Sequence, residues 1–408
     1  MPRQVLIAAC VLAVAATSNT NSFGLVLARA AEGLGLSPAA LGGLRTLENA
    51  SSIVVAILVA PLIDRFPRKY VMLLGYGIAT VASLTLVLTS SAPGAAGYFL
   101  LNGASIMLIL GALTAMPADF VSGRMLSRVM GLIIGCVAFT SILIAPIVGN
   151  VSEQVGWEAG MLVSASVTGL AFLVTLIVVP GYHVETTSST DGSFLQRYKV
   201  ILGQTPLLLM LGNNLFRFAQ MGAMMTFTST ILLTRFDLPL GRIGIIFAAI
   251  GIVFFVSSTG CGMFLHILKT RRVLVWGSLV VAALMAGVLV LEAPLIVTIA
   301  GIILMIGIVA AQVNTGTIAV LRVSPWARGA AMSWNELAAA SGSLTGIGLG
   351  SIGLAVAGVT GFGVMLGLVA LSGSLVSRIA LSWSGYTDEY DAPGTTQARP
   401  EQVPQSST

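Results

Sequence analysis

Two carboxylates lie well inside long apolar stretches of the sequence, where a charge needs a reason. They are Glu48 and Glu336, and the other thirteen Asp and Glu residues fall in polar connections, tails or the ends of apolar stretches. A charged side chain in hydrocarbon costs at least about 2.5 to 3.5 kcal/mol, so such residues mark functional or structural sites. We interpret both as proton-coupling residues, whose protonation would respond to burial and to neighbouring charges. Gating contacts and structural ion pairs stay open as alternatives.

Two arginines also lie inside apolar stretches. Arg45 precedes Glu48 by three residues, so both side chains would share one helix face, and we expect Arg45 to contribute to a gate or to neutralise Glu48. Arg217 stands near the middle of its stretch, with Met221 and Met224 following at helical spacing. A cation beside two adaptable thioethers suits recognition of an organic molecule with an anionic or polar group. A structural salt bridge, for example to Glu336, is the alternative.

Amide side chains interrupt the same apolar stretches. SNTNS at 18–22 and AAQVNTGT at 310–317 are the clearest cases. Asn19, Thr20 and Asn21 span about 200° of a helix, so they cannot all face one cavity, and the others would bond to neighbouring helices or to the backbone. The candidate substrate-binding residues are Asn19, Asn21, Arg217, Gln220, Met221, Met224, Gln312 and Asn314.

The elements that carry these residues are predicted to be membrane-spanning helices. The chain has 408 residues, of which 56% are hydrophobic and only 9% charged, and its mean hydropathy is +0.97. Because lipid leaves no backbone group unpaired and the runs are continuous, we expect an all-α polytopic protein and not a barrel. The twelve predicted spans are 4–28, 39–62, 70–90, 96–117, 128–150, 159–180, 205–233, 242–265, 273–291, 295–320, 329–356 and 361–383.

The distribution of basic residues predicts the orientation. Fifteen Lys and Arg residues fall on one predicted side and three, namely Arg29, Arg235 and Arg242, on the other. The positive-inside rule then places both termini in the cytoplasm. The net charge of +5 is thus explained by topology, and no nucleic-acid partner is expected. The three cysteines lie inside spans without metal-ligand spacing, so no metal site is expected.

The sequence also divides into two similar halves. Pro38 and Gly43 recur 201 residues later as Pro239 and Gly244, and Asn19 corresponds to Gln220 at the same offset. We predict an N-terminal six-helix bundle at 1–182, a cytoplasmic linker at 183–204, a C-terminal six-helix bundle at 205–383 and a disordered tail at 384–408.

Twelve helices in two halves, with a basic turn after the second, resemble the major facilitator superfamily. In APLIDRFPRK the residues Asp64, Arg65, Arg68 and Lys69 match that family's signature, whereas Ala60 and Pro67 replace two glycines. The resemblance implies that Asp64, Arg65 and Arg68 hold an inner gate. It also implies that the first helices of the two halves, with Asn19 and Gln220, face each other across a central cavity. The antiporter signature of the fifth helix is present only in part.

These features predict a secondary transporter that moves a small organic solute by alternating access, with proton-coupled efflux as the main hypothesis. A proton symporter or facilitator importing a small, possibly anionic solute is the alternative, and a non-transporting receptor on the same fold is the second. No nucleotide fingerprint or hydrolytic motif occurs, so an enzyme is not expected, and no cofactor is expected either. We expect a monomer in a bacterial cytoplasmic (inner) membrane.

Overall fold

The structure is a computed structural model, and it describes residues 3–63, 66–116, 120, 129, 132–133, 135–181, 203–324 and 328–383. These residues form helices joined by short turns, with no strand among them. Nine segments in this part are long and apolar enough to cross a membrane. The last, Trp334–Trp383, holds two predicted spans, and the two spans outside the nine segments coincide with α3 (Pro38–Leu44) plus α4 (Thr46–Ile63) and with α11 (Thr205–Phe236). The prediction of an all-helical membrane protein is confirmed.

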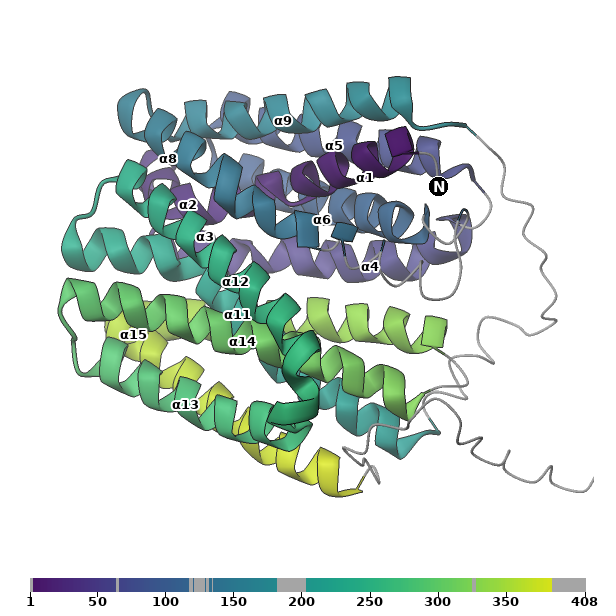
Figure 1. Cartoon of the computed structure of the whole chain (residues 1–408). Helices are drawn as coiled ribbons and strands as arrows, with labels where there is room; N and C mark the ends of the chain where they lie inside the picture. Colours follow the sequence, from purple (N-terminus) through teal and green to yellow (C-terminus); the bar gives the residue numbers. More distant parts are fainter. Residues whose placement is uncertain are drawn as a thin grey trace, which may run out of the picture.

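The first half of the chain forms one group of packed helices, here called the first bundle (Figure 1). Besides α3 and α4 it contains α1 (Arg3–Ala16), α2 (Ser18–Gly33), α5 (Arg68–Thr89), α6 (Ala92–Ala115), the π-helix η2 (Thr140–Ile144), α8 (Ala145–Gln154) and α9 (Trp157–Val178). Serine residues begin two of these helices, because the Ser37 hydroxyl accepts from the Ala40 N–H and the Ser91 hydroxyl from the Gly94 N–H.

The second bundle follows from α11 onward. It adds α12 (Leu240–Leu268), the π-helix η3 (Arg272–Trp276), α13 (Gly277–Leu284), the π-helix η4 (Met285–Val290), α14 (Leu295–Val323) and α15 (Arg328–Trp383). The chain reverses inside α15 at Ala357 and Gly358, where Gly358 has φ of 60°, a value that a residue without Cβ adopts readily. The two arms of α15 thereby become separate helices, and α11 packs extensively on α15.

The bundles touch where α2 packs on α11 and α12, where α3 and α4 pack on α15, and where η2 and α8 pack on α12. Near α2, the Ser229 hydroxyl of α11 donates to the Gly24 carbonyl oxygen. The contacting parts of α2, α8 and α12 adjoin the connections Leu34–Ser37, Val155–Gly156 and Asp237–Pro239. We call this the Glu153 end of the molecule, after the residue at the end of α8.

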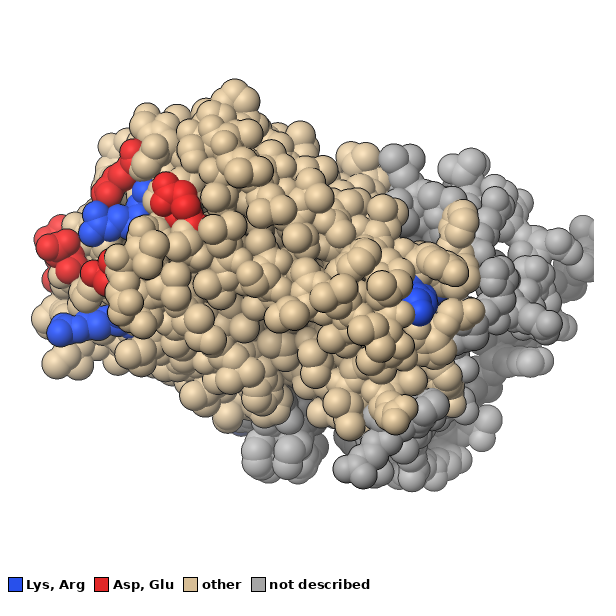
Figure 2. Space-filling model, turned by 90° about the horizontal axis from the view of Figure 1, so that it is seen from above, with Lys and Arg blue, Asp and Glu red and all other residues tan. Residues whose placement is uncertain are grey.

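The outer surface is suited to lipid. Large apolar side chains such as Leu88, Leu170, Ile296 and Val356 are more than half exposed on several helices. In the view of Figure 2, most of the charged side chains gather at one end, one basic side chain shows toward the other, and a broad uncharged band covers the middle. An exposed apolar band of this kind is stable next to acyl chains and not next to water.

Candidate functional site

The first predicted span is broken at Thr17, at the edge of the SNTNS stretch. α1 ends at Ala16 and α2 begins at Ser18, with Thr17 at φ −111° and ψ 13°. The Thr140 hydroxyl, from the first residue of η2, donates to the Val14 carbonyl oxygen at 2.5 Å, and the Thr17 hydroxyl donates to Thr140 Oγ1 at 3.1 Å. A break in one helix thus meets a π-helix in another, and hydroxyls satisfy backbone groups at the break.

The side chains of SNTNS tie this span to several neighbours in its own bundle. Asn19 Nδ2 donates to the Ala79 carbonyl oxygen of α5 at 2.8 Å, and the Tyr98 hydroxyl of α6 donates to the Asn19 carbonyl oxygen at 3.0 Å. The Ser164 hydroxyl of α9 donates to Ser22 Oγ at 2.6 Å. Asn19 is buried inside the first bundle and not on a cavity wall as predicted. Its amide can be buried because the α5 carbonyl oxygen accepts the hydrogen bond that water would otherwise accept.

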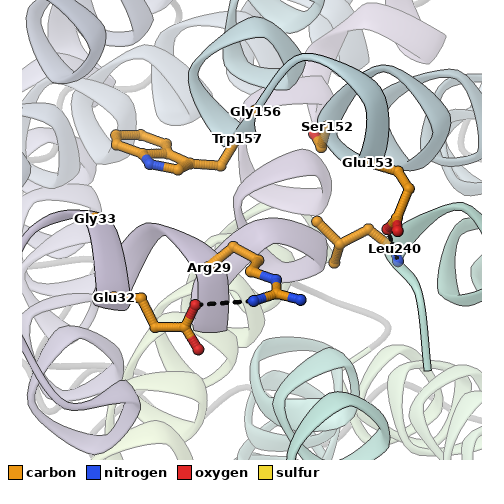
Figure 3. A pocket seen from close by; sticks show the side chains of 8 residues that line it. All are labelled: Arg29, Glu32, Gly33, Ser152, Glu153, Gly156, Trp157 and Leu240. Carbon is orange, nitrogen blue, oxygen red and sulfur yellow. Dashed lines mark hydrogen bonds and ion pairs between the residues drawn. The ribbon is translucent and has the colours of Figure 1, made fainter. Parts of the chain in front are cut away.

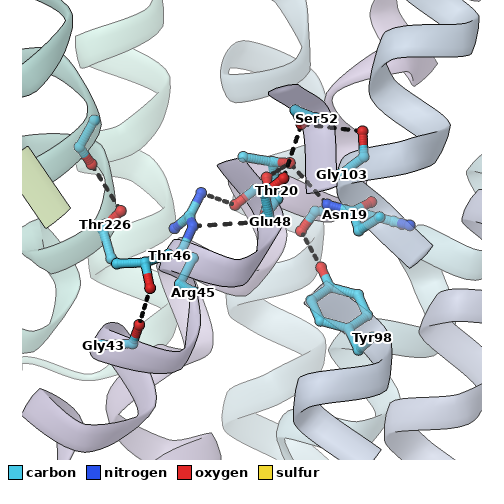
Figure 4. A network of polar contacts seen from close by, with 12 residues as sticks. Asn19, Thr20, Gly43, Arg45, Thr46, Glu48, Ser52, Tyr98, Gly103 and Thr226 are labelled. Carbon is cyan, nitrogen blue, oxygen red and sulfur yellow. Dashed lines mark hydrogen bonds and ion pairs between the residues drawn. The ribbon is translucent and has the colours of Figure 1, made fainter. Parts of the chain in front are cut away.

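Glu48 belongs to a buried network of four polar side chains (Figure 4). Thr20 donates its hydroxyl to Glu48 Oε1 at 2.7 Å, and Asn102 Nδ2 of α6 donates to Thr20 Oγ1 at 3.0 Å. Arg45 Nε lies 3.6 Å from Glu48 Oε2, and Arg45 Nη2 donates to the Thr20 carbonyl oxygen at 3.1 Å. Arg45 and Glu48 are 4% and 5% exposed, so the predicted pairing of these two residues is present and is shielded from solvent.

Arg45 also stands beside the contact between the bundles. A Cβ added at Gly24 would lie 3.1 Å from Arg45 Nη1 and 2.7 Å from the Met225 carbonyl oxygen of α11. Arg45 Nη1 and Glu48 Oε2 are buried atoms without a hydrogen-bond partner. Movement of α11 away from α2 would therefore change the surroundings of Arg45 directly.

Arg217 is directed into the second bundle. Its guanidinium donates to the carbonyl oxygens of Asn213 at 2.9 Å, Leu274 at 3.0 Å and Gly373 at 3.2 Å, to Ser278 Oγ at 3.3 Å and to Ser377 Oγ. It is 1% exposed, and among the described residues no carboxylate pairs with it, including Glu336. The predicted role in substrate recognition and the alternative pair with Glu336 both differ from this geometry, because helix dipoles and hydroxyls surround the cation instead.

Four more of the predicted substrate-binding residues are buried or half-buried on helices of the second bundle. Gln312 is buried, and its Nε2 donates to Ser278 Oγ at 3.0 Å and to the Val273 carbonyl oxygen at 3.1 Å. Asn314 is half-buried and donates to the Ser258 carbonyl oxygen of α12 at 2.6 Å. The other two, both buried, are Gln220 and Met224.

Asn21 and Met221 lie where the first helices of the two bundles face each other. Each precedes by three or four residues the contact that Gly24 makes with α11 near Met225, and each side chain is half-buried. Among the predicted substrate-binding residues they are therefore placed best to line a space between the bundles. The structure places both beside the contact between α2 and α11, with Asn21 Nδ2 donating to Thr17 Oγ1 at 3.4 Å, and it leaves Asn19, Arg217 and Gln312 inside the bundles.

Glu336 is exposed on the first arm of α15. Ala340, Ser343 and Ile347 follow it at i+4, i+7 and i+11, so the four residues share one stripe. Ile347 is only 2% exposed, and nearby Ser351 faces α3, since its Oγ would lie 3.8 Å from a Cβ at Gly43. Within the stripe, Ser343 donates to the Phe218 carbonyl oxygen of α11 at 3.4 Å. The stripe is therefore buried at Ile347, close to the contact of Ser351 with α3, and exposed at Glu336.

Of the remaining predicted gate residues, Arg68 is buried at the start of α5. Asp64 and Arg65 lie outside the described residues. Residues 183–202 of the predicted linker and the predicted tail from 384 lie outside them as well.

A pocket of about 310 Å³ opens at the Glu153 end (Figure 3). It is lined by Arg29, Glu32, Gly33, Ser152, Glu153, Gly156, Trp157 and Leu240. Arg29 pairs with Glu32 at 3.0 Å, and Glu153 Oε2 accepts from the Leu240 N–H of the second bundle at 2.6 Å.

Sequence reasoning missed several residues that the structure brings into the site. Thr20 donates to Glu48 directly, and Asn102 donates to the Thr20 hydroxyl. Glu153 makes a hydrogen bond between the bundles. The sequence signal for Thr20 was its position within SNTNS, next to Asn19 and about 100° from it around the helix. No sequence signal pointed to Glu153, which reads as an ordinary carboxylate at a helix end.

Comparisons with known proteins agree with the fold. The model of the Major Facilitator Superfamily matches residues 7–347. The crystal structure of the nucleoside transporter NupG aligns with a TM-score of 0.74 and 14% sequence identity, covering 95% of this chain and 100% of NupG. A point mutant of NupG aligns with a TM-score of 0.77 and 12% sequence identity, covering 92% of this chain and 99% of the mutant. An inward-facing, unoccupied bacterial homologue of the human lysosomal transporter Spinster aligns with 0.70 and 14% over 93% and 95%. No curated protein sequence gives a match. At these identities the structural likeness shows the fold alone.

Proposed function

The chain belongs to the Major Facilitator Superfamily, and we propose that it is a secondary active transporter that exports a small organic solute in exchange for protons. The two bundles, with bounds near 182 and 205, would rock about a central site so that it opens to one side of the membrane at a time. The Glu153 end would face outward and both termini the cytoplasm of a bacterial cell, with the protein acting as a monomer in the inner membrane.

One observation carries this proposal: a stripe on α15 is packed at Ile347 and exposed at Glu336. Described inter-bundle contacts at Gly24, Gly42 and Gly149 are close, since a Cβ at each would lie within 3 Å of an atom of the other bundle. Bundles that are tightly packed at the Glu153 end and expose a carboxylate toward the other end would fit one state of an alternating-access cycle.

Glu48 and Glu336 are the proposed coupling residues. Glu48 is buried next to the inter-bundle contact with one oxygen unbonded, and Glu336 is exposed and unpaired among the described residues. The two carboxylates therefore meet different surroundings in this one state, and movement of the bundles would exchange those surroundings. A carboxylate whose environment alternates can bind a proton in one state and release it in the other.

The solute is proposed to be neutral or cationic. The two arginines inside the spans are engaged and shielded, with Arg45 4% and Arg217 1% exposed, so neither is available for an anion. Asn21 would offer hydrogen bonds and Met221 an adaptable apolar surface to such a solute. NupG is a nucleoside transporter, and neutral nucleosides therefore belong in the first panel of solutes, next to organic cations.

Transport by protein reconstituted in vesicles tests the proposal. Solutes of each class are loaded, pH gradients of either sign are imposed, and wild type is compared with Glu48→Gln, Glu336→Gln and the exposed loop variant Glu292→Gln. We expect gradient-driven flux to vanish in at least one of the first two variants while solute exchange without a gradient persists. Full gradient-driven flux in both carboxylate variants would contradict the coupling role.

Exchange itself separates a transporter from a receptor on the same fold. A transporter exchanges labelled for unlabelled solute across the bilayer, whereas a receptor binds the solute without exchange. Uptake driven by an inward proton gradient, instead of extrusion, would favour the symporter.

A further inference from the structure

Glu153 makes a charged contact across the two bundles. Its Oε2 accepts from the Leu240 N–H at 2.6 Å, so a carboxylate at the end of α8 binds the first turn of α12. Pro239, the residue directly before α12, makes no side-chain hydrogen bond that caps this helix. The first N–H groups of a helix lack internal partners and carry partial positive charge, so Glu153 supplies what α12 itself lacks.

The same two helices approach each other with backbone contact. A Cβ added at Gly149 would lie 2.5 Å from the Leu240 carbonyl oxygen, and one added at Gly244 would lie 2.7 Å from the Ala145 carbonyl oxygen. Any separation of the bundles at this end must therefore break a tightly fitted contact and take Leu240 away from Glu153. The carboxylate would then lose its donor.

The same pocket contains a second positively charged group, in addition to the N-terminus of α12. Arg29 of α2 lines it together with Glu153 and Leu240, is about half exposed, and is bound to Glu32 at 3.0 Å (Figure 3). Arg29, Glu32 and Glu153 all belong to the first bundle and would move together, whereas Leu240 belongs to the second. Arg29 is the cationic side chain among the residues lining the pocket, so it could form an ion pair with Glu153 when α12 moves away.

We propose that Glu153 is a gating residue that exchanges partners: it binds the N-terminus of α12 when the Glu153 end is closed and Arg29 when that end opens. The closed contact uses a helix terminus at a tight interface, and the open contact uses an exposed arginine. Surface ion pairs are worth less than charge-assisted bonds to a helix terminus in a partly buried site. The exchange therefore favours the closed end while reducing the cost of opening.

A cysteine at Ser351 reports separation of the bundles at a neighbouring contact, between α15 and α3. Ser351 is 8% exposed, faces Gly42 and Gly43 of α3 and has no hydrogen-bond partner for its hydroxyl, so Ser351→Cys removes no bond. The three native cysteines are first replaced. Thiol labelling is then measured on protein in lipid nanodiscs, where the reagent reaches both faces. The assay needs no solute, so its outcome is independent of the transport test.

Four variants, one of them a double variant, and one control decide the proposal. Glu153→Gln should speed labelling about fivefold, since it weakens the bond to α12, and Glu153→Ala about tenfold. Arg29→Gln should slow labelling by up to about fivefold, and it should have no effect when Glu153 is already Gln. Glu158→Gln, on α9 near the same end, should label like wild type.

Two results would overturn the exchange. Labelling of Glu153→Gln and Glu153→Ala at the wild-type rate would remove Glu153 from the gate. An equal effect of Arg29→Gln with Glu or Gln at position 153 would show that Arg29 is not its alternative partner.

Discussion

Replacement of Arg217 by methionine separates a structural cation from a substrate-binding one. The guanidinium serves three carbonyl oxygens and two hydroxyls, all from the second bundle, and is 1% exposed. Methionine keeps much of the volume and supplies no donor. A buried acceptor left without a donor costs about 1 to 3 kcal/mol. Removal of the guanidinium offsets part of this cost, because the folded protein no longer has to bury a charge away from water. Three of the five acceptors keep another donor, because Gln312 Nε2 also donates to the Leu274 carbonyl oxygen and to Ser278 Oγ, and Ser377 Oγ donates to the Gly373 carbonyl oxygen. The expected loss of stability is therefore about 1 to 3 kcal/mol.

The assay compares unfolding of purified wild type, Arg217→Met and the exposed-site control Arg242→Gln in the same detergent, together with solute binding by the folded fraction. We expect a clear loss of stability in Arg217→Met, none in the control, and near-normal solute affinity. Wild-type stability combined with lost affinity would refute the structural assignment and return Arg217 to the substrate site.

Three further changes test other contacts. Gly346→Ala should destabilise the second bundle by at least about 1 to 3 kcal/mol, because its Cβ would lie 1.9 Å from a backbone oxygen of α11; thermal unfolding checks this, and an unchanged midpoint contradicts it. Thr20→Val removes the hydroxyl bound to Glu48 and should weaken proton coupling more than exchange without a gradient; equal loss of both would argue for misfolding. Thr140→Ala leaves the Val14 carbonyl without its donor and should cost about 1 kcal/mol, measured by denaturation against Thr140→Ser as the matched control.

Hydropathy was enough to predict most of the fold. The apolar runs predict helices because a bilayer permits few other structures. The charge asymmetry predicts an orientation and the offset of 201 predicts two similar halves. The positions of two charged residues along the chain match the predicted spans, since Arg217 lies within α11 and Glu48 lies in the first turn of α4, directly after α3.

Which way a polar side chain points was not readable. Asn19 and Arg217 occupy the depth expected of cavity residues, yet each finds its partners inside its own bundle. A helix places neighbouring residues about 100° apart, so a small error in helix rotation moves a residue from cavity to core, and the break at Thr17 adds such a rotation. Glu153 was missed because its partner, Leu240, is a backbone group brought close only by tertiary packing.

The distance between the bundles at the Glu153 end tests the central claim most directly. Spin labels at Val155 and Leu291, both highly exposed and on different bundles, report it by pulsed electron paramagnetic resonance in a background without native cysteines. A second pair, Val155 with Leu88, lies within the first bundle and serves as control. We predict two distances for the first pair, whose proportions shift with pH, transported solute or Glu153→Gln, and one constant distance for the second. A single distance for the first pair under all these conditions would contradict alternating access by movement of the two bundles.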